Sequence, residues 1–481
     1  MTTKTGAGTL SWRWTSLYAA GATAAFHLAY GWPALSVLIV AYLFCLYQLA
    51  RARTGRQAFY TGLAVGLLTV GPQLKCFQVI FGPAAIELWL IIALWIGMFA
   101  ALARLCLARL GAVRTALLAP FLWTGLEYFR SELYYLRFSW LNVGYAFSGN
   151  LPPLCFGCLG MYGIGFLAMA IAAGLSLLRP LHAGLTALTL AAVMAAMPLL
   201  KTQAAFSGAS DARVRSVQVA GVQLEFPFQG DVTAALDRLL AASPGAELLV
   251  LSEYTFLDAV PNSVKQWCRA HHRHLIVGGE DPASKGNYYN TAFVIDPAGE
   301  IVFRQVKCVP IQFFKDGLPA PEQKLWESPW GRIGICICYD LCYTRVTDRL
   351  IRLGAEAFVV PTMDVADWGR REHELHARVA PVRAAEYGVP IFRVASSGIS
   401  QLVDRSGRET AKTGFPGEGE MISGRLCFDQ RGSLPLDRWL APFASGVTGV
   451  LMLWFLIQRG PGRPPKSAGA ENQQTQRPQN I

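Results

Sequence analysis

The feature that most constrains this chain is a stretch of 37 residues, 14–50, without a single Asp, Glu, Lys or Arg. A helix that crosses the hydrocarbon core of a bilayer needs only about 20 residues. The stretch is therefore long enough for two helices, with Gly31-Trp32-Pro33 as the turn between them. Comparable apolar runs follow, so we predict a membrane α-helical bundle with about eight transmembrane helices, at 15–30, 33–50, 57–74, 81–103, 115–129, 153–178, 180–200 and 439–458.

The distribution of charge supports a membrane protein and argues against a nucleic-acid partner. Only 16% of the residues are charged, against about 25% in an ordinary soluble domain. Residues 1–210 hold three acidic and thirteen basic side chains, and so supply ten of the eleven net positive charges. These basic residues sit between long apolar runs, which is typical of cytoplasmic loops in membrane proteins rather than of a patch that binds nucleic acid.

Basic residues also predict the orientation of the chain. With the N-terminus in the cytoplasm, thirteen basic residues of loops and termini lie inside and four lie outside, which fits the positive-inside rule. Seven helices then place the region after them on the outer side. The expected organisation is a transmembrane bundle (1–201), an extracytoplasmic catalytic domain (202–438), a last transmembrane helix (439–458) and a disordered cytoplasmic tail (459–481).

The region after residue 213 has the pattern of an α/β domain. Short runs rich in Val, Ile and Leu alternate with helical stretches, and turn sequences such as DPAGE and DRSGR predict a mixed sheet. We expect strands at 214–223, 248–253, 274–280, 290–296, 300–306, 332–338, 357–361 and 391–396, and helices near 232–242, 261–272, 343–353 and 369–387.

Three reactive side chains stand at ends of these predicted strands: Glu253, Lys307 and Cys338. A cysteine can accept an acyl group, a glutamate can take the thiol proton, and a lysine can stabilise the oxyanion that develops. Together they predict a covalent acyl-transfer site at the carboxyl ends of strands. The alternative is that Cys338 is a small buried strand residue, as we assume for Cys336.

Glu127 lies inside the apolar segment 115–129, with Arg130 one helical turn further on. A carboxylate at membrane depth is costly unless it is paired or faces water. Two interpretations remain open: a functional group on the membrane side, or a structural pair between Glu127 and Arg130.

Several motifs in one order make the chain resemble the apolipoprotein N-acyltransferases, membrane members of the nitrilase (carbon–nitrogen hydrolase) superfamily. The resemblance covers nearly the whole chain, and its motifs are W-x-x-x-E-Y-x-R at 123–130, SWLNVGYAF at 139–147, VQVAGVQ, LLVLSE, Tyr289-Asn290, GICICYD, R-A-A-E-Y-G-V-P at 383–390 and SSGISQLVDRSGR.

The resemblance implies a four-layer α-β-β-α sandwich with a Glu–Lys–Cys triad. Glu253 would be the general base, Lys307 the electrostatic partner and Cys338 the nucleophile, supported by the adjoining Tyr339 and Asp340. It further implies a ping-pong N-acyltransferase without a cofactor or metal. An acyl chain would pass from a phospholipid, through a thioester, to the α-amine of a diacylglyceryl-cysteine lipoprotein. The setting would be the bacterial inner membrane, and a monomer is expected.

The lysine motif departs from the family pattern K-x-H-L-V-P-F-G-E. Aligned without a gap on Val309-Pro310, Gln305 occupies the lysine position and Lys307 the histidine position. Residues two apart share a face of a strand, so Lys307 remains able to reach the site. Phe313 stands where the family has an additional Glu, and polar groups nearby include Gln312, Lys315 and Asp316; Gln312 is a candidate oxyanion donor.

Two other functions use the same residues: a membrane-tethered amidase in which water resolves the thioester, or a silent homologue that only binds lipid or lipoprotein. His373 and His376 do not match the metalloprotease pattern H-E-x-x-H, so we expect no metal there. Arg383 and Glu386 are expected to form a structural pair.

Overall fold

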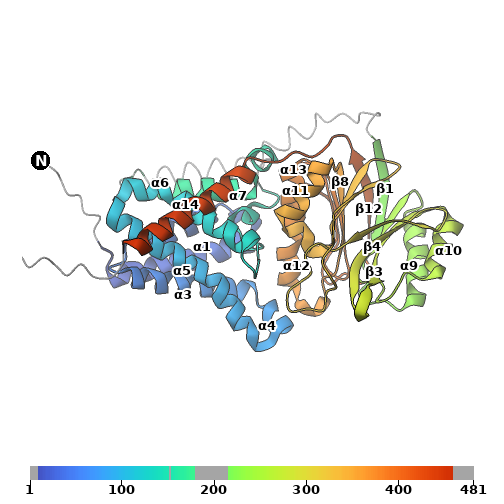
Figure 1. Cartoon of the computed structure of the whole chain (residues 1–481), viewed down its shortest axis with the longest axis horizontal. Coiled ribbons are helices and arrows are strands. Elements are labelled where there is room, and N and C mark those ends of the chain that lie inside the picture. The colour runs from blue at the N-terminus through green and yellow to red at the C-terminus, as the bar shows by residue number, and fades with distance from the viewer. Residues whose placement is uncertain (1–8, 151–152, 179–181, 183–214, 459–481) are drawn as a thin grey trace, which may run out of the picture.

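A computed structural model describes residues 9–150, 153–178, 182 and 215–458. Figure 1 shows a helical half beside a sandwich of two sheets, with the last helix, α14, returning to the helical half. The helices of the helical half are α1 (Trp12–Gly31), α2 (Leu38–Gln48), α3 (Gly55–Gln73), α4 (Cys76–Phe81), α5 (Ala85–Leu110), α6 (Ala112–Tyr128), α7 (Pro153–Leu175) and α14 (Asp437–Ile457).

Seven of the eight predicted spans coincide with helices of the described residues, while the span at 180–200 lies almost wholly outside them. Three helical segments in the described ranges are long and apolar enough to cross a membrane: Cys76–Leu110, Cys155–Leu175 and Asp437–Ile457. The count of eight transmembrane helices therefore stays a prediction. The tail predicted to be disordered, 459–481, also lies outside the described residues.

The sandwich consists of two six-stranded mixed sheets. The first sheet has the order β12-β1-β2-β3-β4-β5 and comprises β1 (Arg215–Val222), β2 (Leu248–Val250), β3 (His274–Pro282), β4 (Tyr288–Ile295), β5 (Ile301–Val306) and β12 (Met421–Phe428). The second has the order β11-β10-β9-β8-β7-β6 and comprises β6 (Leu325–Glu327), β7 (Arg332–Ile335), β8 (Ala357–Thr362), β9 (Ile391–Ala395), β10 (Gln401–Val403) and β11 (Glu409–Lys412). In each sheet the central strands are parallel and the outer pairs antiparallel, as the turn sequences predicted.

Four layers result from what each sheet face buries. The inner faces of the two sheets share one apolar core, with Val219 of β1 and Ile335 of β7 among its members. The outer face of the first sheet packs on α9 (Gln229–Ala242) and α10 (Asn262–His271). The outer face of the second packs on α11 (Thr344–Leu353) and α13 (Val379–Tyr387), and α12 (Arg370–Ala377) lies just before α13. This confirms the predicted sandwich.

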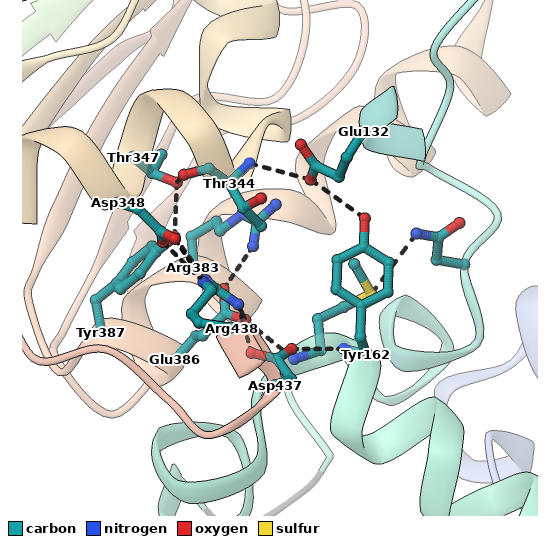
Figure 2. Close-up of polar contacts among 12 residues, drawn as sticks. Glu132, Tyr162, Thr344, Thr347, Asp348, Arg383, Glu386, Tyr387, Asp437 and Arg438 are labelled. Carbon is teal, nitrogen blue, oxygen red and sulfur yellow. Dashed lines mark hydrogen bonds and ion pairs between the residues drawn. The ribbon is translucent and has the colours of Figure 1, made fainter. Parts of the chain in front are cut away.

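The apolar core of the helical half continues without a break into the α11–α13 layer, so the two halves share buried surface. A set of polar residues lies across this junction, which Figure 2 shows and which we call the docking network: Glu132, Tyr162, Thr344, Asp348, Arg383, Glu386, Tyr387, Asp437 and Arg438.

The docking network ties α14 and the end of α6 to the sandwich. Arg438, the second residue of α14, contacts Asp348 at 2.8 Å and Glu386 at 3.0 Å. Glu132 accepts hydrogen bonds from the Thr344 backbone N–H at 3.1 Å and the Tyr162 hydroxyl at 3.2 Å. The predicted Arg383–Glu386 pair forms, with Nη1 and Oε2 2.5 Å apart and both side chains buried. Buried ion pairs of this kind fix the geometry of a junction more than they add to its stability.

Candidate active site

Cys338 lies on a sharp turn in the segment that connects β7 to α11. β7 ends at Ile335, and Cys338 begins a short 3-10 helix (Cys338–Cys342) with φ of +51°. A positive φ is strained for a residue with a side chain and is found where the surrounding fold fixes the backbone, often at reactive positions. The thiol is only 3% exposed, and its Sγ lies 3.8 Å from the Met363 carbonyl oxygen.

Glu253 follows β2 by three residues and reaches the same point from the first sheet. Its Oε1 accepts hydrogen bonds from Lys307 Nζ at 2.8 Å and Asn290 Nδ2 at 2.6 Å. Its Oε2 accepts one from the Met363 backbone N–H at 2.9 Å. Besides burial, the negative charge of Glu253 also raises the pKa of the Cys338 thiol. Three donors thus hold Glu253 in place beside the cysteine.

Lys307 directly follows β5 and is 1% exposed. Its Nζ contacts Glu253 Oε1 at 2.8 Å, whereas the equally buried Gln305 donates its amide to the Val306 and Glu322 carbonyls. Lys307, and not Gln305, therefore lies next to Glu253. Its Nζ also contacts Asp316 Oδ2 at 2.8 Å, so the ammonium sits between two carboxylates.

Asp316 and Asn290 are the polar partners that sequence reasoning did not assign to the site. Asp316 accepts from Asn290 Nδ2 at 2.9 Å, the Tyr254 hydroxyl at 2.8 Å and the Ile311 backbone N–H at 2.7 Å. The signals were present, because Asn290 belongs to a motif of the resemblance and Asp316 was among the polar residues after the lysine. Asp316 lies in a loop, three residues after Phe313, and the sequence could not show that this loop brings it to Lys307.

The charges around Lys307 act on each of its neighbours. Burial raises the pKa of Glu253, and although Lys307 opposes this, the negative charge of Asp316 adds to it. Burial also acts to raise the pKa of Asp316, but contact with Lys307 outweighs it and the pKa falls below its usual range. Burial and the Glu253 carboxylate raise the pKa of the Cys338 thiol well above its ordinary value. In the resting site the Cys338 thiol is therefore neutral, and the Glu253 carboxylate beside it has an increased affinity for a proton.

Asp340 and Tyr339 support the turn that carries Cys338. Asp340 is fully buried and accepts from the backbone N–H groups of Cys308 at 3.0 Å, Val309 at 2.8 Å and Ile337 at 3.3 Å. It therefore joins the cysteine turn to the loop after Lys307. The Tyr339 hydroxyl donates to the Arg137 carbonyl at 3.1 Å, which links the turn to the helical half.

Two hypotheses from the sequence concern Gln312 and the pair of Glu127 with Arg130. The side-chain amide of Gln312 donates to the Tyr135 carbonyl, which closes a contact between the two halves, and the residue also lines the pocket, so its role as an oxyanion donor stays a prediction. The pair between Glu127 and Arg130 does not form in the described residues. Glu127 accepts from the Val143 N–H at 2.9 Å, and Arg130 donates to Asn142 Oδ1 at 2.5 Å. Both side chains hold the loop after α6, because its polar groups are closer than the two side chains are to each other.

An apolar pocket that is partly open to solvent leads to Cys338. Its walls come from both halves of the chain. α4 and α5 contribute Phe77, Phe81, Leu88, Ile91 and Ile92, and the sandwich contributes Tyr339, Trp368 and the 311–314 loop. The rings of Phe81 and Phe314, 5.6 Å apart, join the two walls.

Behind Cys338 part of the pocket wall is polar, and Asp364 and His376 in it are paired with each other. Asp364 contacts His376 Nδ1 at 2.8 Å and also binds Arg393. The Trp140 ring stacks on His376 with centroids 4.8 Å apart. These contacts indicate that His376 has a structural role in this part of the pocket wall.

Comparison with known proteins agrees with both halves of the chain. The family model described as "Apolipoprotein N-acyltransferase N-terminal domain" matches residues 18–174, and the model "Carbon-nitrogen hydrolase" matches residues 218–424. The apolipoprotein N-acyltransferase of Shewanella oneidensis is 25% identical over 434 residues, which cover 78% of this chain and 82% of the relative. That of Geobacter metallireducens is 26% identical over 335 residues, 60% of this chain and 64% of the relative.

Two further matches cover a smaller share of the chain. Nit3 of Saccharomyces cerevisiae, of the nitrilase superfamily, has a TM-score of 0.38 and 20% identity, and covers 44% of this chain and 90% of its own. The deaminated glutathione amidase of Dictyostelium discoideum is 28% identical over 138 residues, 25% of this chain and 47% of the relative. The two models match consecutive parts of the chain, and the relatives that span both parts are apolipoprotein N-acyltransferases, so the comparisons support membership of that family.

Proposed function

We propose that this chain is an apolipoprotein N-acyltransferase that moves an acyl chain from a phospholipid to the α-amine of a diacylglyceryl-cysteine lipoprotein. The observation that carries the proposal is the pocket, whose apolar wall from α4 and α5 ends at a cysteine held beside Glu253 and Lys307. An acyl chain needs such a wall, whereas the small polar substrate of an amidase does not.

In the first half-reaction, Glu253 takes the proton of the Cys338 thiol as the sulfur attacks the ester carbonyl of the phospholipid. A C–S bond forms, the C–O bond to glycerol breaks, and the proton on Glu253 passes to the departing alkoxide. The product is a lysophospholipid and a thioester on Cys338.

Lys307 stabilises the oxyanion of this step. An ammonium has three N–H donors, and Glu253 and Asp316 each occupy one. The third remains available for the oxyanion that forms at Cys338, to which the ammonium is electrostatically coupled. Phe313 stands where the family has an additional Glu. Asp316 supplies the second negative charge beside Lys307 instead.

In the second half-reaction, the neutral α-amine attacks the thioester. A C–N bond forms and the C–S bond breaks, and Glu253 moves the amine proton to the sulfur. No metal or nucleotide takes part in either step. Water in place of the amine would give free fatty acid, the outcome expected of a hydrolase.

The proposed membrane arrangement follows from the charge distribution of the chain. Residues 1–201 and 439–458 form eight transmembrane helices, 202–438 lie on the outer side of the bacterial inner membrane, and 459–481 are cytoplasmic. Reporter fusions at the C-terminus and in the 202–214 segment test this arrangement, since the two reporters should respond on opposite sides.

Mass spectrometry of the Cys338 peptide after incubation of the detergent-purified protein with phospholipid tests the chemistry. We expect an acyl mass on Cys338 that neutral hydroxylamine removes and that Cys338→Ala lacks, and an N-acylated product when a diacylglyceryl-cysteine peptide is added. Release of free fatty acid with no N-acylated peptide would support a hydrolase. A folded protein with no adduct and no fatty acid release would leave only a binding function.

A further inference from the structure

A second acidic side chain, Glu372, faces the same pocket and has no role in the chemistry above. It lies in the first turn of α12, is 1% exposed and lines the pocket together with Cys338. Neither of its carboxyl oxygens accepts a hydrogen bond from any residue in the described part of the chain. A buried carboxyl group without partners is costly, by several kcal/mol when it is ionised, and so calls for an explanation.

The groups around Glu372 do not satisfy it. His373 Nδ1 lies 3.1 Å from Glu372 Oε2, but the same nitrogen faces the Gly369 carbonyl at 3.1 Å. Burial lowers the pKa of His373 to about 4, so the ring is neutral at pH 7 and contributes no positive charge. Arg393 is committed to Asp364 and to the Ile399 carbonyl.

The position of Glu372 relative to the nucleophile is set by α12. Glu372 and His376 are four residues apart and share one face of this helix. His376, Asp364 and Cys338 in turn bring their ligand-type atoms within 4.8 Å of one another. A substrate group that contacts Glu372 is therefore about one helical turn from the residues that surround the sulfur.

We propose that Glu372 binds the primary ammonium group of the acyl acceptor as it approaches the thioester on Cys338. The inference rests on the proposed function, in which the second substrate is an amine that enters this pocket. An ammonium supplies the donors and the positive charge that the carboxylate lacks, and charge-assisted hydrogen bonds are the strong ones.

The environment of Glu372 also suits the release of one proton from that ammonium. Burial and the negative charge of Asp364 raise the pKa of Glu372 well above its usual value, although Arg393 opposes them, so the carboxylate has an increased affinity for a proton. Glu372 takes one proton, and the nitrogen gains the lone pair with which it attacks. After the amide leaves, Glu372 returns the proton to water.

The test compares two acceptors on one acyl-enzyme. Cys338 is acylated with phosphatidylglycerol, which has no amine, and the thioester is then offered either a diacylglyceryl-cysteine peptide or hydroxylamine, which is uncharged at neutral pH. In Glu372→Gln we expect transfer to the peptide to fall about tenfold or more below saturation, with a raised KM, because a charged hydrogen bond is lost. Deacylation by hydroxylamine and formation of the acyl-enzyme should match wild type.

The matched control is Glu374→Gln, on the same helix but half-exposed and paired with Arg371. It should leave both acceptors unaffected. Glu372→Asp keeps the carboxylate and should recover part of the peptide transfer, which separates a charge effect from a defect in folding.

Three results are decisive. Wild-type transfer to the peptide in Glu372→Gln overturns the inference. A defect confined to acylation by phosphatidylethanolamine, with phosphatidylglycerol and the peptide unaffected, overturns it too, because the ammonium would then be the donor headgroup. Failure of the wild-type protein to form any acyl-enzyme refutes the proposed function instead, which is a different observation.

Discussion

Replacing Asp316 by Asn tests the idea that a second carboxylate tunes the general base. Asp316 Oδ2 and Glu253 Oε1 each lie 2.8 Å from Lys307 Nζ, so the two oxygens are at most twice that distance apart. At an effective dielectric constant of about 20, their repulsion is then about 3 kcal/mol.

The charges in the site determine the direction in which the pKa of Glu253 should move. The negative charge of Asp316 raises the pKa of Glu253, and the base works only when it is ionised. Asp316→Asn removes that charge, so the pKa of Glu253 falls and the acid limb of the pH–rate profile moves to lower pH. A weaker base also abstracts the thiol proton more slowly, and we expect acylation of Cys338 to slow roughly ten- to hundredfold on the plateau.

The substitution also affects stability. All four contacts of Asp316 come from donors: Lys307, Asn290, the Tyr254 hydroxyl and the Ile311 N–H. The new amide NH₂ must face two of them, which costs about 1–3 kcal/mol. Thermal unfolding should show this loss separately from the rate.

The assay is single-turnover acylation of Cys338 followed by mass spectrometry between pH 5 and 9. Asp258→Asn, on an exposed position of the same half, is the control and should behave as wild type. Wild-type acylation by Asp316→Asn, with an unshifted acid limb, would refute the reasoning.

Three further perturbations test other parts of the structure. Lys307→Met leaves Glu253 and Asp316 buried without a cation, so we expect a loss of about 3–5 kcal/mol in the free energy of unfolding and no acyl-enzyme, by denaturant titration and mass spectrometry. Arg438→Ala removes the cation between Asp348 and Glu386, and we expect separate unfolding transitions for the two halves in calorimetry where wild type shows one. Burial raises the pKa of Glu386, but Arg438 and Arg383 outweigh it and lower the pKa to about 2, so the stability it contributes is present above its ordinary pKa and is lost as pH falls toward 2. Tryptophan fluorescence of wild type from pH 5 to 2 should report this loss, and the loss should shrink in Arg438→Ala.

Much of the fold could be predicted from the sequence because its helices and central strands have clear apolar periodicity. The α9 to α11 helices and the eight predicted strands form close to their expected positions. The predicted helix 369–387 is interrupted at Arg378. The strands β6, β10, β11 and β12 escaped prediction, because three of them are only three or four residues long and β12 alternates with polar residues at the sheet edge.

The site was less predictable, since it depends on contacts between distant segments. Local spacing named Glu253, Lys307 and Cys338, and the side-chain contacts in the structure then decide between Lys307 and Gln305. No sequence pattern could show that Asp316 reaches Lys307 from a loop, or that the Val143 backbone N–H takes the carboxylate of Glu127. These interactions are set by tertiary packing, on which periodicity carries no information.

The docking network makes the helical half and the sandwich a single mechanical unit. α14 begins at Asp437, and the ion pairs of Arg438 clamp its first turn to α11 and α13 (Figure 2). The distance from the helical half to Cys338 is therefore fixed. In the proposed membrane arrangement, a substrate anchored in the bilayer would have to present its reacting bond at that one height, so depth in the membrane would select among substrates.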